Sequence, residues 1–170
     1  MKKIALAALL SACIASPALA ADPVYIGVKA GRTNTSAGGL TSNKDNAAGI
    51  FAGVKFNQNF GFEAAYTDLG KVRNLTNEVK LSAWDLSLVG TLPLNATFSL
   101  NGKLGMANSK SAQTLGGTGK RTAATFGISA QADINPTFAV RVGWDRYGMK
   151  DAAGIKADTD LWSVSGMIKF

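Results

Sequence analysis

The amino-acid sequence predicts an all-β protein, an eight-stranded antiparallel up-and-down transmembrane β-barrel, from three observations. The first is the C-terminal stretch 162–170, in which apolar and polar residues alternate without a break. A membrane β-barrel requires this alternation up to its closing strand, with one face toward lipid. Periodicity alone leaves an ordinary sandwich strand as the alternative. The residues of the apolar face are Trp162, Val164, Gly166, Ile168 and Phe170.

The second observation is that this alternation recurs along the chain in segments of about ten residues. Eight strands make the smallest standard barrel of bacterial outer membranes. In chain order, the expected strands are 24–32, 46–56, 60–69, 81–92, 98–108, 122–134, 138–147 and 160–170. Each expected strand has apolar residues at its even positions. In the first strand these are Val24, Ile26, Val28 and Ala30, and in the last strand they are the residues of the apolar face given above.

The third observation is that the odd positions of these strands carry charged and polar residues. Such a set would be a poor core for a soluble protein, because buried charges and amides are costly to desolvate. It is the ordinary lining of a membrane barrel, whose interior is polar. The even face is therefore expected to point toward lipid. The odd set comprises Lys29, Glu63, Asp85, Ser87, Asn101, Lys103, Ser129, Gln131, Arg141 and Asp145.

Composition supports a barrel and excludes other classes. The chain has no run of 18 apolar residues, so a helical membrane protein is excluded, and lipid then leaves a closed sheet as the way to satisfy the backbone. The net charge of +7 falls to +5 without Lys2 and Lys3, which is too mild to indicate nucleic-acid binding.

The N-terminus predicts export. Lys2 and Lys3 precede an apolar run from Ile4 to Ile14, and residues 16–20 form a small-residue cleavage site. We expect a signal peptide over 1–20 and one barrel domain over 21–170. A lipobox at residues 10–13, ending in Cys13, is the alternative, with lipidation of that cysteine. After cleavage at residue 20 the chain has no cysteine and must fold without disulfides.

Loop lengths and aromatic residues predict the orientation. Segments 57–59, 93–97 and 135–137 are short turns, whereas 33–45, 70–80, 109–121 and 148–159 are expected to be long loops. Short turns face the periplasm in bacterial barrels. Two aromatic rows are separated by a rise of roughly 20 Å, as expected for interfacial girdles. The rows are Phe56, Phe60, Phe98, Phe138 and Phe170 near the short turns, and Tyr66, Trp84, Trp144 and Trp162 further along.

Three stretches resemble the transmembrane domain of OmpA-like outer-membrane proteins, in the same order and spacing. They are 61–71, 92–98 with the following 103–105, and 133–141. The resemblance covers nearly all of the predicted mature chain. It implies a lumenal salt-bridge network that blocks a continuous water path. The chain ends at the barrel, so the periplasmic peptidoglycan-binding domain of full-length OmpA proteins is not expected here.

The matching lumenal positions are Lys29, Glu63 and Arg141, with Lys103 beside them. Gln131 stands where the family often has a second lumenal glutamate, so Asp85 or Asp145 is the candidate replacement. Counted physically, three central cations face three carboxylates, and a balanced lumen can pair internally. Such a network is either a static plug or a gate whose pairs exchange partners, and we favour the plug because eight strands leave a narrow interior.

Enzymatic activity, cofactors and metal sites are not expected. The sequence has no histidine, so a loop serine such as Ser109 or Ser111 lacks a base, and no His/Cys metal cluster can form. The loops carry two basic clusters that a phosphate-rich surface would favour. These candidate lipopolysaccharide contacts are Lys71, Arg73, Lys80, Lys110, Lys120 and Arg121.

The sequence therefore predicts an integral outer-membrane protein of a Gram-negative bacterium, with a structural, surface-exposed role that includes adhesion or host contact. The alternative is a narrow, low-conductance pore for water and small ions. Expected partners are outer-membrane lipid and lipopolysaccharide, with periplasmic chaperones and the barrel-assembly machinery during biogenesis. The terminal strand resembles the assembly signal that this machinery reads. We expect a monomer.

Overall fold

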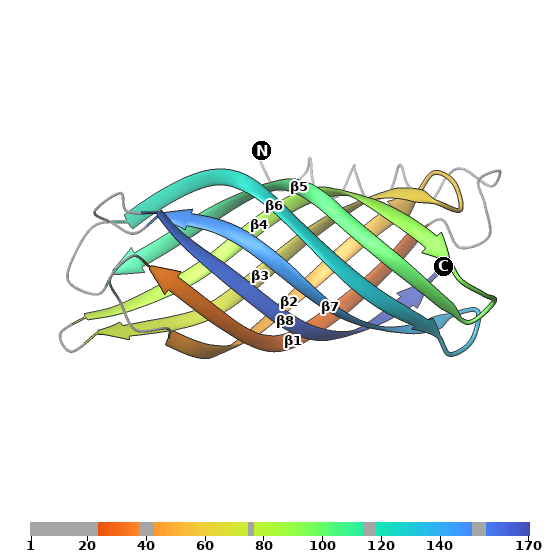
Figure 1. The fold of residues 1–170 in the computed structure, drawn as a ribbon, viewed down its shortest axis with the longest axis horizontal. Coiled ribbons are helices and arrows are strands. Elements are labelled where there is room, and N and C mark those ends of the chain that lie inside the picture. The colour runs from red at the N-terminus through yellow and green to blue at the C-terminus, as the bar shows by residue number, and fades with distance from the viewer. Residues whose placement is uncertain (1–23, 38–42, 75–76, 114–117, 151–155) are drawn as a thin grey trace, which may run out of the picture.

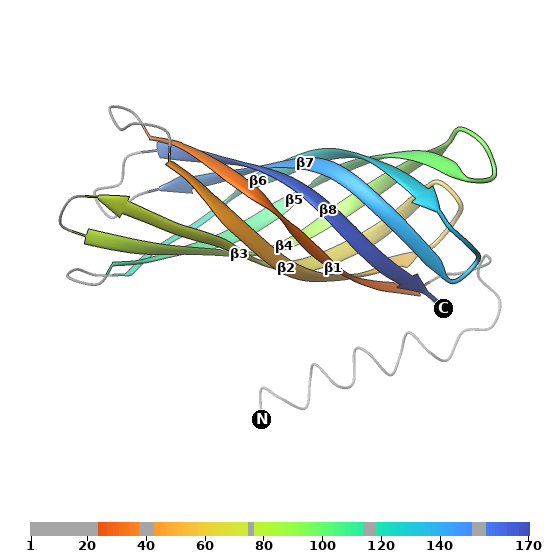
Figure 2. The same cartoon turned by 90° about the horizontal axis from the view of Figure 1, so that it is seen from below.

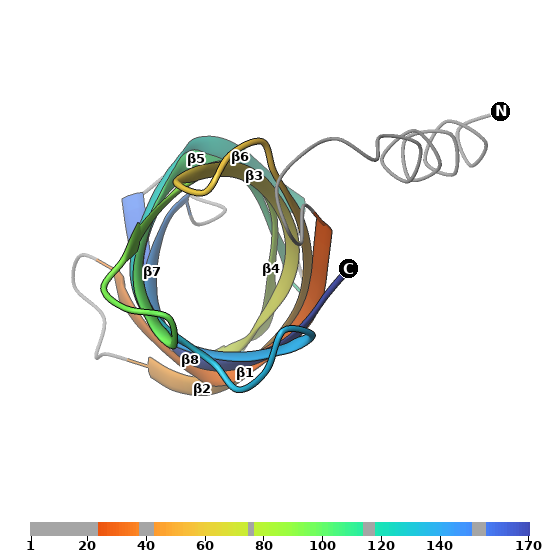
Figure 3. The ribbon, with the colours of Figure 1, turned by 90° about the vertical axis from the view of Figure 1, so that its right-hand side faces the viewer.

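The computed structural model describes residues 24–37, 43–74, 77–113, 118–150 and 156–170. They form a closed antiparallel barrel of eight strands in chain order, with β1 also paired to β8 (Figures 1 and 3). This confirms the predicted fold class. The strands are β1 Val24–Ala37, β2 Asn43–Lys55, β3 Phe60–Asn74, β4 Asn77–Pro93, β5 Phe98–Gln113, β6 Thr118–Asp133, β7 Phe138–Lys150 and β8 Lys156–Lys169.

The strands are longer than the sequence predicted, and apart from Pro93 at the end of β4 the additional length lies at the end with the long loops. β4 starts at Asn77 instead of 81, and β5 runs to Gln113 instead of 108. The expected loops 33–45, 70–80, 109–121 and 148–159 are therefore mostly strand. Above the membrane the outward residues become polar, so the alternation disappears from the sequence, while the backbone ladder continues.

The predicted faces are confirmed by solvent exposure. Even-numbered apolar residues lie on the outside, as Val28 and Leu104 do at 62% and 64% exposed, whereas Glu63 and Asp85 are each 4% exposed. In the register, even positions pair with even positions around the wall, for example Leu88 with Leu104. The outward side chains thus form one continuous apolar surface.

Three short turns lie at the end of the barrel away from the long loops (Figure 2). They share one local structure. In each, an asparagine side-chain oxygen accepts hydrogen bonds from the backbone N–H groups two and three residues later, at 2.7–2.9 Å. This is the Asx-turn that asparagine favours. The third residue after each asparagine is a phenylalanine that starts the next strand. The motifs begin at Asn57, Asn95 and Asn135 and lead to Phe60, Phe98 and Phe138.

A β-bulge interrupts the pairing of β3 with β4 near the long-loop end. The register shifts between Asp68 and Gly70, and Gly70 has a φ of 83°. Glycine suits this left-handed conformation because it has no Cβ. Leu69, the additional residue, is buried at 1% exposure. The bulge thereby places one more apolar side chain in the interior.

Among the described residues the structure contains no helix long and apolar enough to cross a membrane. The predicted signal peptide 1–20 and Cys13 lie outside the described residues.

Replacing glycine with alanine is expected to lower stability on the inner face of the barrel but not on its outer face. A Cβ on the inward Gly31 would collide with the carbonyl oxygen of Trp162 and lie 2.8 Å from the Cα of Ser163, whereas a Cβ on the outward Gly166 would meet nothing within 4 Å. Gly31→Ala is therefore expected to lower the free energy of unfolding by about 1–3 kcal/mol. The matched control Gly166→Ala should change it by less than about 0.5 kcal/mol. Urea unfolding from lipid vesicles measures both, and equal losses would contradict the assignment.

Candidate functional site

The six predicted central charges lie in one layer across the middle of the lumen. Lys103, from β5, is at its centre: its Nζ lies 3.2 Å from Asp85, 3.3 Å from Asp145 and 4.0 Å from Glu63. The three carboxylates come from three different strands, β4, β7 and β3. One ammonium group therefore connects strands on different sides of the barrel.

Arg141 makes the shortest ion pair of the layer. Its Nη1 lies 2.8 Å from Glu63 Oε2, and its Nη2 donates to Gln131 Oε1 at 3.2 Å. The hydroxyl of Tyr25 donates to the same Glu63 oxygen at 3.0 Å. Gln131 thus accepts a hydrogen bond from the guanidinium, at the position where the resembled family often has a glutamate. From Gln131 the network continues to Asp133, at 2.9 Å.

Lys29 contacts Asp145 and Tyr147. Its Nζ lies 3.9 Å from Asp145 and donates to the hydroxyl of Tyr147 at 3.2 Å, and no ion pair to Glu63 is found among the described residues. Tyr147 in turn donates to Asp85 at 3.3 Å. The tyrosine therefore links Lys29 to the carboxylate that Lys103 also holds.

Two apolar clusters enclose this layer from either side. They pack inside the lumen, where the sequence predicted a polar lining, so that prediction is incomplete. Toward the long loops lie Ala47, Leu69, Leu81, Ala83, Ala107, Tyr147 and Leu161. Toward the short turns lie Tyr25, Phe51, Ala65, Ala139 and Met167.

Inward glycines make room for the large side chains of the second cluster. A Cβ at Gly27 would collide with the Phe51 ring, and a Cβ at Gly53 would collide with the Tyr25 ring. The two rings meet edge to face, with centroids 6.2 Å apart. The guanidinium of Arg141 lies 5.4 Å from the centroid of Phe51, within the range of a cation–π contact. The cluster therefore also supports the ion pair.

A small cavity of about 30 Å³ lies beside the charged layer. Its lining includes Lys103, Asn101 and Arg141. Asn101 Nδ2 and Arg141 Nε have no hydrogen-bond partner among the described residues. The space is large enough for a water molecule, which would accept from these donors.

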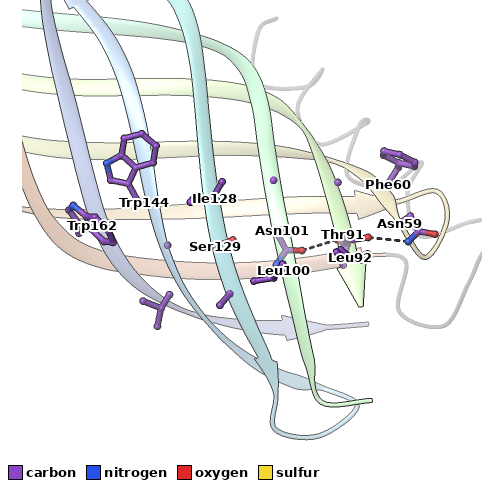
Figure 4. Close-up of a pocket in the computed structure, with 15 residues that line it drawn as sticks. Asn59, Phe60, Thr91, Leu92, Leu100, Asn101, Ile128, Ser129, Trp144 and Trp162 are labelled. Atoms are coloured by element: carbon purple, nitrogen blue, oxygen red, sulfur yellow. Dashed lines mark hydrogen bonds between the residues drawn. The ribbon is translucent and has the colours of Figure 1, made fainter. Parts of the chain in front are cut away.

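A larger hollow of about 980 Å³ lies in the wall of the barrel rather than in its lumen (Figure 4). Its apolar lining consists of outward, even-numbered residues, among them Phe60, Leu100 and Ile128. Gly90 and Gly102 face each other across β4 and β5, and neither has a side chain to fill the space. The hollow is therefore a groove in the lipid-facing surface.

The predicted aromatic rows all lie on the outer face or its edges. Trp84 and Trp162 are 54% and 63% exposed, and the rings of Tyr66 and Trp84 pack at a tilt of 47° with centroids 4.8 Å apart. Trp144 is half-buried beside Phe126 and Arg146. The row at the short turns is exposed throughout and comprises Phe56, Phe60, Phe98, Phe138 and Phe170.

In β8 the side chains of Trp162 and Val164 are exposed on the outer wall and Ile168 is half-buried, and the exposed Phe170 follows directly after the strand. Gly166 lies between Val164 and Ile168 on the same face. The Phe170 N–H donates to the Val24 carbonyl at 2.9 Å. The assembly signal stays a prediction.

The structure divides the predicted basic contacts between two faces. Lys80, Lys110 and Lys120 are exposed on the outside, whereas Arg121 lies opposite the buried Ser109 on the lumenal face. Lys71 lies opposite Lys80 in the backbone register, and the side chains of Lys71 and Arg73 lie outside what the structure describes.

Sequence reasoning missed Tyr25, Tyr147 and the apolar lumenal residues. Their odd position numbers within alternating strands were the available signal, because parity alone places them inside. In the described part of the chain, no group of three or more His, Cys, Asp or Glu residues is placed to hold a metal ion.

These features define a membrane-spanning β-barrel: a closed sheet with an apolar outer face and a charged interior. The chain belongs to the outer membrane protein beta-barrel domain family, whose model matches residues 5–170. It is therefore an outer-membrane protein of the OmpA-like class in a Gram-negative bacterium, which confirms the predicted family and location. As such it resides in a bilayer with lipopolysaccharide.

Solved structures show the same fold. The chain is similar to Neisserial surface protein A, with a TM-score of 0.74 and 17% identity over 86% of this chain and 97% of that one. It is similar to the attachment invasion locus protein Ail of Yersinia pestis, with a TM-score of 0.62 and 17% identity over 88% of this chain and 99% of that one. It is also similar to the N-terminal β-barrel domain of Pseudomonas aeruginosa OprF, with a TM-score of 0.57 and 12% identity over 86% of this chain and 97% of that one. No curated protein sequence matches the chain.

Proposed function

We propose that this protein is a non-enzymatic, structural barrel exposed at the cell surface, with a lumen closed by its charged layer and the apolar clusters on either side. The observation that carries the proposal is Lys103, which lies within 4.0 Å of three carboxylates while Arg141 binds one of them. The absence of histidine from the sequence supports a role without acid–base or metal catalysis.

The charged layer and the apolar clusters both oppose the passage of water and ions through the lumen. Removing one partner from a buried ion pair typically costs about 3–5 kcal/mol, because a charge is left without compensation. The apolar cluster that includes Leu69, Leu81 and Leu161 adds a constriction of buried side chains, and hydrophobic constrictions close pores by dewetting. A permeating ion would have to disrupt both.

The strands that extend beyond the aromatic row support a surface role. β4 runs seven residues past Trp84 to Asn77, so part of the wall is expected to stand above the membrane on the outside. The similar fold of a protein named for attachment and invasion supports contact with other cells as the form of that role. We further propose that the barrel is a monomer, and that periplasmic chaperones and the assembly machinery deliver it, with Phe170 in the terminal strand as part of the signal.

One observation favours the second candidate, a narrow pore for water and small ions. The cavity of about 30 Å³ beside Lys103 and the unpartnered donors of Asn101 and Arg141 provide room and hydrogen-bond donors for a water molecule in the charged layer. Exchange of ion-pair partners would extend this water path.

Planar-bilayer conductance distinguishes the two functions. The parent protein is expected to show rare or no steps, because the apolar cluster and the ion pairs both remain closed. The triple variant Leu69→Ser/Leu161→Ser/Glu63→Ala disrupts both the loop-side apolar cluster and the charged layer, and it should show frequent small steps, which verifies that the assay detects an open lumen. Frequent steps from the parent protein would establish the pore and overturn the closed barrel.

A further inference from the structure

Three lysines form a compact basic patch on the outer face of β4, β5 and β6. Lys110 and Lys120 are directly opposite each other in the register, and Lys80 is diagonal to Lys110 because it pairs with Ala112. Directly opposite residues have Cβ atoms about 5 Å apart, and diagonal ones are about 7–8 Å apart. All three side chains are exposed. Their ammonium groups can therefore reach one anionic group together.

No ion pair involving Lys80, Lys110 or Lys120 is found among the described residues. The position opposite Lys110 on β4 is Ser82, and Arg121 on the neighbouring lumenal position points away from the patch. Like charges directly opposite each other destabilise a sheet. The lysine pair thus costs stability unless an anion binds between its members.

The height of the patch indicates which anion it meets. Lys80 lies four residues beyond Trp84 toward the long loops, which corresponds to about 10 Å above the aromatic row for strands tilted by about 40°. Below the patch the outer face is apolar, with Leu86, Leu88, Leu104 and Met106 all exposed on β4 and β5. The ligand therefore combines acyl chains with phosphates at the outer interface.

We propose that Lys80, Lys110 and Lys120 form a binding site for the phosphate groups of lipopolysaccharide in the outer leaflet. The lipid's acyl chains cover the apolar wall of β4 and β5, and its phosphates neutralise the three ammonium groups. The site lies outside the lumen, so lipopolysaccharide binding does not depend on whether the barrel is closed or conducting. Its test is therefore separate from that of the proposed function.

The test is calorimetric titration of lipopolysaccharide into the purified, folded full-length mature barrel in a neutral detergent. The double variant Lys110→Gln/Lys120→Gln should bind roughly thirtyfold more weakly, because each basic residue near an anionic lipid surface contributes roughly a fivefold factor. Lys110→Arg/Lys120→Arg keeps both charges and should retain binding. Without lipopolysaccharide, the glutamine variant should unfold at the same or a higher urea concentration than the parent, since the like-charge pair is gone.

The matched control is Arg32→Gln/Lys44→Gln, which removes two exposed outward cations from β1 and β2. It should leave the affinity nearly unchanged. An equal loss in this control would overturn the site in favour of diffuse attraction. Unchanged binding by the Lys110/Lys120 variant, or equal binding of dephosphorylated lipopolysaccharide, would overturn it directly. Equally tight binding of phosphatidylglycerol at the same phosphate concentration would overturn the assignment to lipopolysaccharide.

Discussion

Replacing Glu63 with alanine is expected to lower the free energy of unfolding by about 3–5 kcal/mol, the usual cost of breaking a buried ion pair. Glu63 is 4% exposed and accepts from both Arg141, at 2.8 Å, and Tyr25, at 3.0 Å. Its removal leaves the guanidinium without its shortest ion pair. Water entering the lumen is then the available compensation, so the variant should also conduct more than the parent.

A double-mutant cycle separates the pair from general damage. Glu63→Ala/Arg141→Ala should lose less stability than the sum of the two single variants, because the second substitution removes the charge that the first left unpaired. Urea titration of the barrel in lipid vesicles measures the cycle, and planar-bilayer recording measures conductance. Strictly additive losses, with conductance at the parent level, would show that Glu63 is simply hydrated and that the network does not close the lumen.

Placing an arginine on the lipid face, as in Leu104→Arg, is expected to lower the free energy of unfolding by about 2–4 kcal/mol, the cost measured near the bilayer midplane. Leu104 is 64% exposed on the outer wall and pairs with Leu88 and Phe126 across its neighbours. The penalty arises because the guanidinium meets hydrocarbon. Urea unfolding from vesicles provides the measurement.

The lumenal control for this variant is Ser129→Ala, which removes a half-buried hydroxyl on the inner face of β6 and should have little effect. Ser87 is a poorer control, because its hydroxyl donates to Asp85 at 3.1 Å and so belongs to the charged layer. Comparable losses at Leu104 and Ser129 would contradict the assignment of the two faces.

Ion-pair partners illustrate what sequence reasoning could not supply. Parity placed Lys29, Glu63 and Arg141 inside the barrel, but the structure pairs Glu63 with Arg141, 78 residues away, and Lys29 with Asp145. Partner choice depends on how far each strand is shifted along its neighbour when the sheet closes and on how far each side chain reaches. Neither quantity is visible in an alternating pattern.

The sequence by itself determined the number of strands, their order of apolar and polar faces, and the positions of the short turns. It could do so because successive side chains of a strand point to opposite faces and lipid requires one of them to be apolar. Only the tertiary structure decided the strand ends, because the backbone ladder continues past Asn77 and Gln113 where no apolar face is needed. It also decided that apolar clusters enclose the charged layer and that Lys110 and Lys120 are neighbours. Both follow from the register of the closed sheet, which brings together residues that are distant along the chain or separated by a loop.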